Sequence, residues 1–306
     1  MQAFYKKQSA NIRKTWGLMT FFLVLVIVLG FFLSSYYGNV NFLYGAIVFS
    51  LLMNVGAYWF SDSIVLLMAN ANPIEKKDEY PELWSVVENL SKEAGLPMPK
   101  LYIINDPAPN AFATGRNKEH AVIAVTTGLL PLLSRSELEG VIAHELSHIG
   151  NRDMLLQSVV VVFAGIISFV ANMALHASMF SGRDERRNPI FSVLYILAII
   201  LAPIAATIIR LAISREREYL ADSTGVLITK YPEGLATALE KISNFHQPMK
   251  VMQPAIAHLF ISDPTGLNGH KEGDSHHKVT WLERLFMTHP PAEDRIARLL
   301  DKKTPM

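Results

Sequence analysis

The sequence predicts a mainly α-helical integral membrane protein, with about four transmembrane helices and a polar α+β domain assembled from two chain segments. Three observations predict this class: long uncharged runs, two polar regions that alternate with them, and mixed helical and strand-like patterns in the polar regions. Of the 306 residues, 50% are hydrophobic and only 18% are charged. Soluble domains carry about 25% charged residues, so the apolar excess indicates a membrane environment.

The first two transmembrane helices are expected between Lys14 and Asp62, a stretch without any charged residue. One apolar run covers residues 16–36 and a second covers residues 42–60. About 20 apolar residues cross the hydrocarbon layer, so each run is long enough to span it. A cleaved signal peptide is the alternative for the first run. Its apolar core is too long for that, and no small-residue cleavage pattern follows it.

Two further spans are expected at residues 155–180 and 190–209, which contain no Asp, Glu, Lys or Arg. The alternative is a hairpin of buried helices in a soluble protein, but both runs exceed the usual length of a core helix.

Four basic residues precede the first span, which predicts a cytoplasmic N-terminus and a cytoplasmic polar domain. The three arginines in the link at residues 181–189 conflict with this topology, because that link would then lie outside the cell.

The chain is therefore divided into four parts. Residues 1–68 form a two-span membrane anchor and residues 69–153 a first polar segment. Residues 154–213 form a transmembrane hairpin, and residues 214–306 form a second polar segment. The two polar segments are expected to meet in one domain.

The first polar segment contains the patterns of both helices and strands. A helix is expected at residues 79–94, and strands at residues 101–104 and 120–127, where β-branched residues are frequent. A further helix should begin after Ser134, since Ser134 and Glu137 have the spacing of a capping box.

The second polar segment should begin with a helix that leaves the fourth span. It should end with another after Pro290 and Pro291, with acidic residues in its first turn. Residues 263–278 are expected to form an exposed loop because Gly, Asp and Ser are frequent there. A metal-binding role for the three histidines of this loop is the alternative.

Composition excludes several classes of protein. The formal net charge is only +1, which argues against a nucleic-acid-binding protein that acts through a general basic field. The chain has no cysteine, so a disulfide framework, an iron–sulfur protein and a thiolate zinc site are all excluded.

The helix after Ser134 contains the sequence HELSH, residues 144–148. Histidines four residues apart lie on one face of a helix, so His144 and His148 can bind one metal ion. Glu145 is rotated by about 100° from His144, which places its carboxylate beside the ion rather than on it. The alternative is an amphipathic helix with two surface histidines, but the cap and the apolar flanking residues favour a metal site.

A catalytic zinc ion usually has three protein ligands and one water, so a third ligand is needed. In a chain without cysteine this ligand is His, Asp or Glu. The strongest candidate is Glu218 in the sequence REREYLAD, where Asp222 lies four residues further along the same helical face. Glu218 could bind the ion while Asp222 accepts a hydrogen bond from a ligand histidine. Spacing alone leaves Glu216, Asp222 and Asp153 open as third ligands.

These motifs, in this order, resemble those of the HtpX-type membrane metallopeptidases, which are relatives of the prenyl-protein (CAAX) endopeptidases. The resemblance covers nearly the whole chain, from the two N-terminal spans through PNAFATG, HELSH, an apolar hairpin and REYLAD to the terminal THPPAEDRIARL. It implies a cytoplasmic zincin-like metallopeptidase domain with one Zn²⁺ per chain. It also implies that His144, His148 and Glu218 bind zinc, and that Glu145 is the catalytic acid and base.

The expected mechanism is hydrolysis by a zinc-bound water, whose pKa falls toward about 7. Glu145 takes the proton of this water and later passes it to the leaving amine. His289 or Arg295 could stabilise the oxyanion, although a helix-start histidine and a surface arginine are equally compatible with the sequence. Residues 120–127 are expected to be an edge strand that pairs with an extended substrate.

The predicted function is a zinc endopeptidase of the bacterial inner membrane whose active site faces the cytoplasm. The resemblance implies protein substrates, namely misfolded or damaged membrane proteins and unfolded chains, and a role in quality control and stress response. The lipid bilayer is an expected partner, nucleic acid is not, and the oligomeric state is left open.

Two alternatives remain. A prenyl-protein processing peptidase is disfavoured because four spans in 306 residues leave little room for a large intramembrane chamber. A non-catalytic scaffold or transporter that has kept a zinc site is disfavoured because the four runs contain no charge in mid-span.

Overall fold

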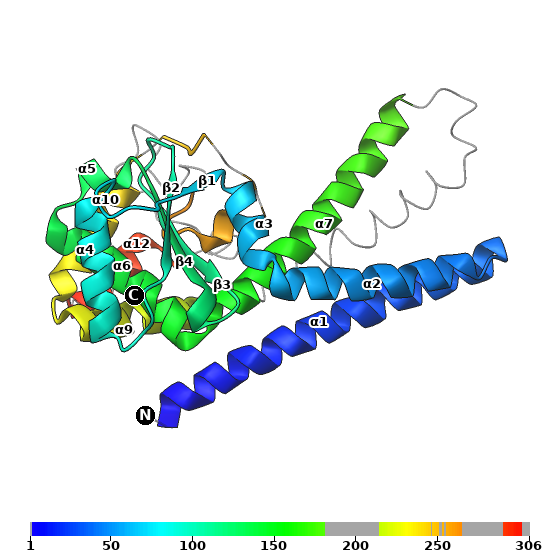
Figure 1. The fold of residues 1–306 in the computed structure, drawn as a ribbon, viewed down its shortest axis with the longest axis horizontal. Coiled ribbons are helices and arrows are strands. Elements are labelled where there is room, and N and C mark those ends of the chain that lie inside the picture. The colour runs from blue at the N-terminus through cyan, green and yellow to red at the C-terminus, as the bar shows by residue number, and fades with distance from the viewer. Residues whose placement is uncertain are drawn as a thin grey trace.

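The computed structural model describes residues 2–180, 214–245, 247–250, 253, 255–264 and 290–301. Within these residues, a compact group of helices around a sheet adjoins a long helical hairpin (Figure 1). Three of the sequence-based expectations lie outside the described residues: the span at 190–209, most of the loop at 263–278, and His289.

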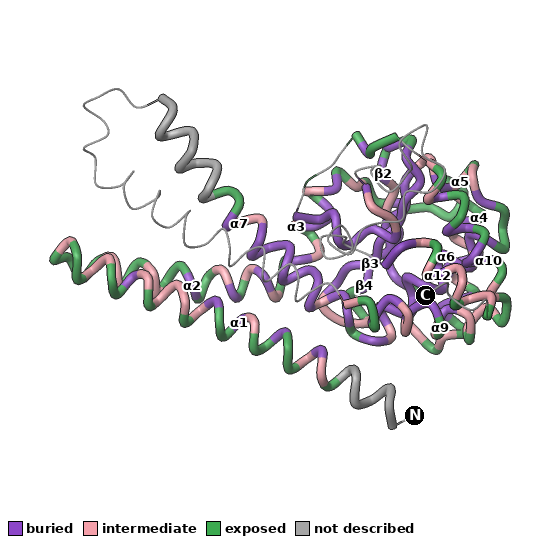
Figure 2. The backbone as a smooth tube through the Cα atoms, turned by 180° about the vertical axis from the view of Figure 1, so that it is seen from behind, coloured by how far each residue is buried: buried purple, intermediate pink, exposed green. Residues whose placement is uncertain are grey.

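The helical hairpin consists of α1 (Gln2–Tyr37) and α2 (Asn41–Trp59). Each is by itself long and apolar enough to cross a membrane, which agrees with the two N-terminal spans expected from the sequence. Large apolar side chains are exposed along both helices, for example Phe32 and Leu52. Figure 2 shows this surface as mixed exposed and intermediate residues. Such a surface suits lipid better than water.

The third expected span corresponds to α7 (Asp153–Phe180). The first half of α7 is buried inside the protein rather than exposed as a lipid-facing helix would be (Figure 2). Phe163 stacks on Phe22 of α1, with ring centroids 4.0 Å apart. The polar domain and the membrane anchor therefore share a core at the start of α7.

The sheet has four strands in the order β1-β2-β4-β3. They are β1 (Ala71–Pro73), β2 (Lys100–Ile104), β3 (Ala111–Gly115) and β4 (Ala121–Thr126). β4 pairs in parallel with β2 and antiparallel with β3, so it is an interior strand.

The expectation that residues 120–127 form an edge strand is therefore wrong. Every residue of β4 is buried, because helices or loops cover both faces of the sheet. A strand buried on both faces has a continuous apolar sequence instead of an alternating one. The edge next to β4 is β3, for which the sequence predicted no strand.

In the described part of the chain, seven further helices surround the sheet. They are α3 (Ser61–Met68), α4 (Pro81–Glu93), α5 (Leu129–Leu132), α6 (Arg135–Asn151), α9 (Arg215–Thr229), α10 (Pro232–Ser243) and α12 (Ala292–Leu299), besides the short 3₁₀ turns η1 (Lys118–His120) and η3 (Ala257–Leu259). The capping box of Ser134 and Glu137 at the start of α6 is confirmed, as is the helix that follows Pro291.

The two faces of the sheet have separate hydrophobic cores. One face packs, through residues such as Ala113 and Ile123, against α4, α6 and α10. The opposite face packs, through Phe112 and Ala124, against α3, α7 and the segment around η3. Both halves of the polar sequence thus contribute to the same domain, with α6 against α9 and α10 of the second segment.

Two glycines allow the second polar segment to approach α6 closely. A Cβ atom on Gly140 would lie 2.6 Å from the backbone nitrogen of Leu235 in α10, and one on Gly225 of α9 would lie 3.1 Å from the backbone nitrogen of His144. Helix backbones can come this close only where one residue has no side chain. Gly225 therefore fixes the distance between α9 and the HELSH segment.

Replacement of Gly140 by alanine is expected to lower the free energy of unfolding by about 1–3 kcal/mol, because the new methyl group meets backbone atoms that cannot rotate away. The matched control is Gly150→Ala in the same helix, where a Cβ meets no atom within 4 Å. This control should be neutral or slightly stabilising, since alanine favours helix by up to about 1 kcal/mol. Thermal unfolding in detergent compares the two. Equal melting temperatures would contradict the close-packing argument.

Candidate metal centre

The candidate site is built on α6, which is buried along most of its length. The capping box fixes its start, and Arg152, in the left-handed region at φ 58°, ends it. α7 follows directly at an angle of 86°. The HELSH segment therefore lies deep in the domain, between the sheet and α9, and Asp153 lies just beyond the bend.

Three side chains converge on one point: His144, His148 and Glu218, all buried. Their ligand atoms lie within 4.8 Å of one another. The two histidine Nε2 atoms are 3.2 Å apart. The Glu218 carboxylate oxygens lie 3.7 Å from Nε2 of His144 and 3.8 Å from Nε2 of His148. The spacing of α9 thus places Glu218 opposite the two histidines.

This arrangement fits a metal ion with tetrahedral ligands. Bonds of about 2.0–2.1 Å at tetrahedral angles separate neighbouring ligand atoms by about 3.4 Å, close to the three separations given above. Two imidazoles and one carboxylate are also the ligand set of several catalytic zinc sites, which leave a fourth position for water.

The charges around the three residues favour a dication as well. Among the described residues, four carboxylates and two arginines are buried in this region: Glu145, Asp153, Glu218, Asp222, Arg217 and Arg295. With all six ionised and both histidines neutral, as metal binding requires, the region has an excess of two negative charges. Buried charges are costly unless they are balanced. A divalent cation between the histidines and Glu218 would balance them.

Glu145 lies next to this point but is not one of the three converging residues. The backbone amide of Ala113 in β3 lies near its carboxylate and lowers the pKa of Glu145. Burial, aided by the negative charge of Glu218, raises the pKa of Glu145 to about 7, although His148 and Arg295 act in the opposite direction. A carboxyl group with this pKa can both take up and release a proton near neutral pH.

Two further carboxylates hold the outer nitrogens of the histidines. Asp222 lies 2.9 Å from Nδ1 of His144, as the spacing of REREYLAD suggests. Asp153 lies 3.2 Å from Nδ1 of His148. Such carboxylates fix the ring orientation and leave the other nitrogen to face a metal. Asp222 and Asp153 thus face the outer nitrogens of the histidines, and Glu216 is exposed. Of these four carboxylates, only that of Glu218 converges with both histidines on one point.

The protonation states of the two histidines differ. Burial and the charge of Arg295 lower the pKa of His144 to about 4, so its ring is neutral at pH 7. Burial also disfavours the charged form of His148, but Asp153 and Glu218 outweigh it and raise the pKa of this ring to about 9. A metal ion has to displace a proton from His148, so binding should release a proton at neutral pH.

Arg295 reaches the site from α12. It is 1% exposed, which rules out the surface arginine that the sequence left open. Nε and one terminal nitrogen of its guanidinium donate to the two carboxylate oxygens of Asp222, at 2.9 and 2.6 Å. Together with His144, Arg295 lowers the pKa of Asp222 to about 2, against the effect of burial. Arg295 thus keeps Asp222 charged and oriented toward His144.

The first membrane helix also contributes to the site. Asn11 of α1 is 6% exposed, and its amide donates to the carboxylate of Asp153 and to the backbone oxygen of Asn151, the latter at 3.2 Å. A chain of contacts therefore runs from α1 through Asp153 to His148. Sequence reasoning missed Asn11, and a polar residue just before an apolar run is too common to indicate such a role.

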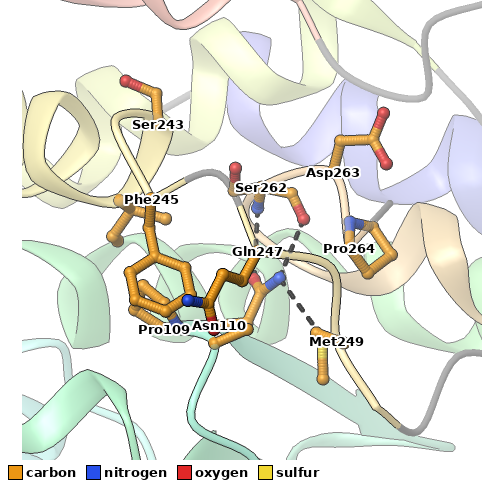
Figure 3. A pocket seen from close by; sticks show the side chains of 11 residues that line it. Pro109, Asn110, Ser243, Phe245, Gln247, Met249, Ser262, Asp263 and Pro264 are labelled. Carbon is orange, nitrogen blue, oxygen red and sulfur yellow. Dashed lines mark hydrogen bonds between the residues drawn. The ribbon is translucent and has the colours of Figure 1, made fainter. Parts of the chain in front are cut away.

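The PNAFATG motif has two structural roles near the site. Its strand β3 supplies the Ala113 contact to Glu145. Its Asn110 holds the segment after α10: the amide donates to the backbone oxygen of Ser262 at 2.9 Å and contacts the sulfur of Met249 at 3.6 Å (Figure 3). The adjoining cavity has a volume of about 20 Å³, enough for a water but not for a substrate.

Replacement of Asp222 by asparagine is expected to weaken metal binding by about 10–100-fold, the usual cost of losing a carboxylate that orients a ligand histidine. Competition with a chromogenic chelator measures this affinity. The matched control is Glu216→Gln on the same helix, where the side chain is exposed and the affinity should not change. An unchanged affinity in the Asp222 variant would show that His144 needs no such support.

Comparisons with known proteins identify the family to which the chain is similar. Residues 77–303 match the peptidase family M48. The chain is 49% identical over 288 residues to a protein of Pyrococcus furiosus named Protease HtpX homolog, with 94% of each chain covered. It is 43% identical over 304 residues to a protein of the same name from Caldanaerobacter subterraneus, with 96% of each chain covered.

A solved structure shares the fold at low sequence identity. The crystal structure of Ste24p from S. mikatae superposes with a TM-score of 0.50 and 18% identity, over 96% of this chain and 67% of that one. At this identity the likeness concerns the fold alone.

Proposed function

The chain belongs to peptidase family M48 and is a membrane metallopeptidase, and on that basis we propose that it is a zinc endopeptidase whose active site faces the cytoplasm. The observation that carries this proposal is the convergence of His144, His148 and Glu218 beside a fourth buried residue, Glu145. We assign the first three as zinc ligands and Glu145 as the catalytic acid and base.

Each residue around the ion has a distinct task in this proposal. A bound zinc ion would supply a water of lowered pKa and polarise the substrate carbonyl. Glu145 accepts a proton from the attacking water and donates it to the leaving amine, a role that its pKa of about 7 favours. Asp222 and Asp153 hold the ligand histidines in their metal-binding orientation.

We propose that an extended substrate pairs with the outer edge of β3. The backbone amide of Thr126 donates to Asn110, so by the alternation of an antiparallel pair the polar backbone groups of Ala113 and Gly115 point away from β4. Strand addition at such an edge gives affinity through main-chain hydrogen bonds, with little demand on the substrate side chains. The backbone amide of Ala113 lies near Glu145, so a peptide that pairs with the carbonyl of Ala113 and with Gly115 would lie beside the acid and base.

The proposed substrates are misfolded or damaged membrane proteins and unfolded chains, within membrane protein quality control under stress. Main-chain recognition supports this breadth, because an unfolded chain presents its backbone in extended form. The proposed setting is the plasma membrane, with one zinc ion per chain and residues 69–153 and 214–306 as a single cytoplasmic domain. The four basic residues in the first turns of α1, before its apolar run, support this orientation.

Metal dependence tests the proposal directly. The full-length chain is purified in detergent with a chelator, and cleavage of an unfolded, fluorescently labelled protein is measured before and after zinc is added. Activity should be absent from the metal-free protein and return at about one zinc ion per chain. A metal-free protein with full activity would exclude a zinc endopeptidase.

The orientation has its own test, because the chain lacks cysteine and single introduced thiols can be labelled cleanly. Replacing Lys92 by cysteine places one thiol on the exposed surface of the polar domain, and Gly38→Cys places another in the turn between α1 and α2. An impermeant maleimide on intact cells should label only position 38. Labelling of position 92 from outside would reverse the proposed topology.

A further inference from the structure

A cavity of about 280 Å³ lies where the membrane hairpin meets the polar domain. Its walls come from α1, the end of α2, the connection between β3 and β4, and the junction of α6 and α7. None of the proposed zinc ligands, nor Glu145, lines it. It is therefore a separate feature from the metal centre.

The cavity lies at the level where the hairpin leaves the membrane. Trp16 and Tyr58 line it and stack on each other with ring centroids 5.9 Å apart. Trp16 and the neighbouring Trp59 are both about half exposed. Tryptophan and tyrosine concentrate at the level of the lipid headgroups. Arg13 and Lys14, just before the apolar run of α1, are exposed at the same end of the hairpin.

Two arginines of the cavity wall have no carboxylate partner among the described residues. The guanidinium of Arg116 lies 4.4 Å from the ring centroid of Trp59 and 2.8 Å from Nε2 of His120. Arg152, at the left-handed end of α6, is exposed and has no ion pair in the described part of the chain. Arginine recognises phosphate oxygens through paired hydrogen bonds. The one acidic residue of the wall, Glu119, is exposed.

We propose that this cavity binds the phosphodiester headgroup of a membrane phospholipid. Arg116 and Arg152 bind the phosphate oxygens, and Trp16 and Tyr58 contact the glycerol and the first acyl carbons. The exposed carboxylate of Glu119 can accept a hydrogen bond from a headgroup hydroxyl or ammonium group. The volume is near the lower end of the range for ligand pockets, about 300–1,000 Å³, which suits a headgroup but not a folded protein segment.

The lipid, rather than a soluble phosphate, is the expected occupant because the aromatic wall continues into the lipid-facing surface of the hairpin. Trp16 is followed along α1 by the exposed apolar residues Phe21 and Val24. Acyl chains attached to a bound headgroup would lie against this surface. A soluble phosphate would gain nothing from it.

The position of the cavity relates it to the metal centre. On α1, the cavity is lined by Ile12 and Thr15, which lie within one helical turn of Asn11. On the opposite wall it is lined by Arg152 and Met154, the two neighbours of Asp153. The hydrogen bond from Asn11 to Asp153 therefore joins the two walls. A bound headgroup would hold α1 against the bend between α6 and α7, the two elements that this hydrogen bond connects.

Native mass spectrometry of the full-length chain in detergent, with added dioleoylphosphatidylglycerol as the probe, tests the proposal. Replacing Arg116 and Arg152 together by glutamine should weaken lipid binding about tenfold or more, because charge-assisted hydrogen bonds are lost. The matched control is Arg13→Gln with Lys14→Gln, which removes the same charge at the same end of the hairpin. Equal loss in both variants would show general attraction to an anionic lipid and would overturn the proposal.

Further probes test whether the bound phosphate belongs to a lipid or to a soluble molecule, and whether it binds in this cavity. Dioleoylglycerol, which lacks the phosphate, should not bind, and glycerol 3-phosphate should bind far more weakly than the lipid. Equal binding of glycerol 3-phosphate would mean a soluble ligand and would overturn the choice of a lipid. Ile12→Trp fills the cavity without any change of charge and should also abolish lipid binding. Retained binding in this variant, with an unchanged melting temperature, would place the lipid elsewhere.

This measurement counts bound lipid and does not depend on peptide cleavage. A chain without peptidase activity could still bind the lipid, and an active chain could fail to bind it. The proposed function and the proposed lipid site can therefore fail independently.

Discussion

Replacement of Glu145 by glutamine is expected to lower the rate of peptide cleavage by about 10²–10⁴-fold, the usual contribution of a general acid and base. Glutamine has nearly the same shape but can neither accept the proton of the attacking water nor return it to the leaving amine. Metal binding should be unchanged, because the Glu145 carboxylate is not among the three converging ligand groups. Cleavage of a labelled unfolded protein and metal analysis by mass spectrometry are measured on the same preparation.

The matched control for this variant is Glu139→Gln in the same helix. Glu139 forms an ion pair with Arg135, and both side chains are partly exposed to solvent. It should retain full activity, since a surface ion pair contributes little to stability. Full activity of the Glu145 variant, at normal metal content, would remove the residue from the mechanism and with it the reading of HELSH as a catalytic motif.

Replacement of Glu218 by alanine is expected to remove one of the three proposed metal ligands and to abolish both metal retention and cleavage. The loss of affinity should exceed the 10–100-fold that the loss of an orienting partner causes. It should therefore also exceed the loss in the Asp222→Asn variant. Chelator competition ranks the two variants on one scale.

Glu216→Gln is the control for Glu218 as well, because it changes a glutamate two residues earlier on α9 whose side chain is exposed. Wild-type affinity in this variant, with loss in Glu218→Ala, would establish which carboxylate binds the ion. Full metal content in the Glu218 variant would instead return Asp153 and Asp222 as candidate ligands.

The features that sequence predicted well depend on neighbouring residues. The two N-terminal helices follow from the length of their apolar runs. The start of α6 follows from the capping box of Ser134 and Glu137, whose reciprocal contacts form within one turn. The shared face of His144 and His148 follows from the helical repeat itself.

The errors concern the pairing of strands. β3 has the sequence AFATG, in which small residues give little preference for a strand. It is held in place by β4 and by the cores on both faces of the sheet. The continuous apolar sequence of β4 was the available signal against an edge position, because it indicates burial on both faces.

By itself, the sequence determined that two N-terminal helices are long and apolar enough to cross a membrane, and that one helix carries a pair of histidines four residues apart. Through the absence of cysteine, it also determined that any third ligand is a carboxylate or another histidine. These properties depend on composition and on the repeat of a single helix. Only the tertiary structure decided that Glu218 faces the histidines while Asp222 and Asp153 lie behind them. It also brought Arg295 of α12 and Asn11 of α1 to the same carboxylates, across separations of 73 and 142 residues. The physical reason is that a hydrogen bond between distant segments is set by how the helices pack, and no local preference of the chain encodes that packing.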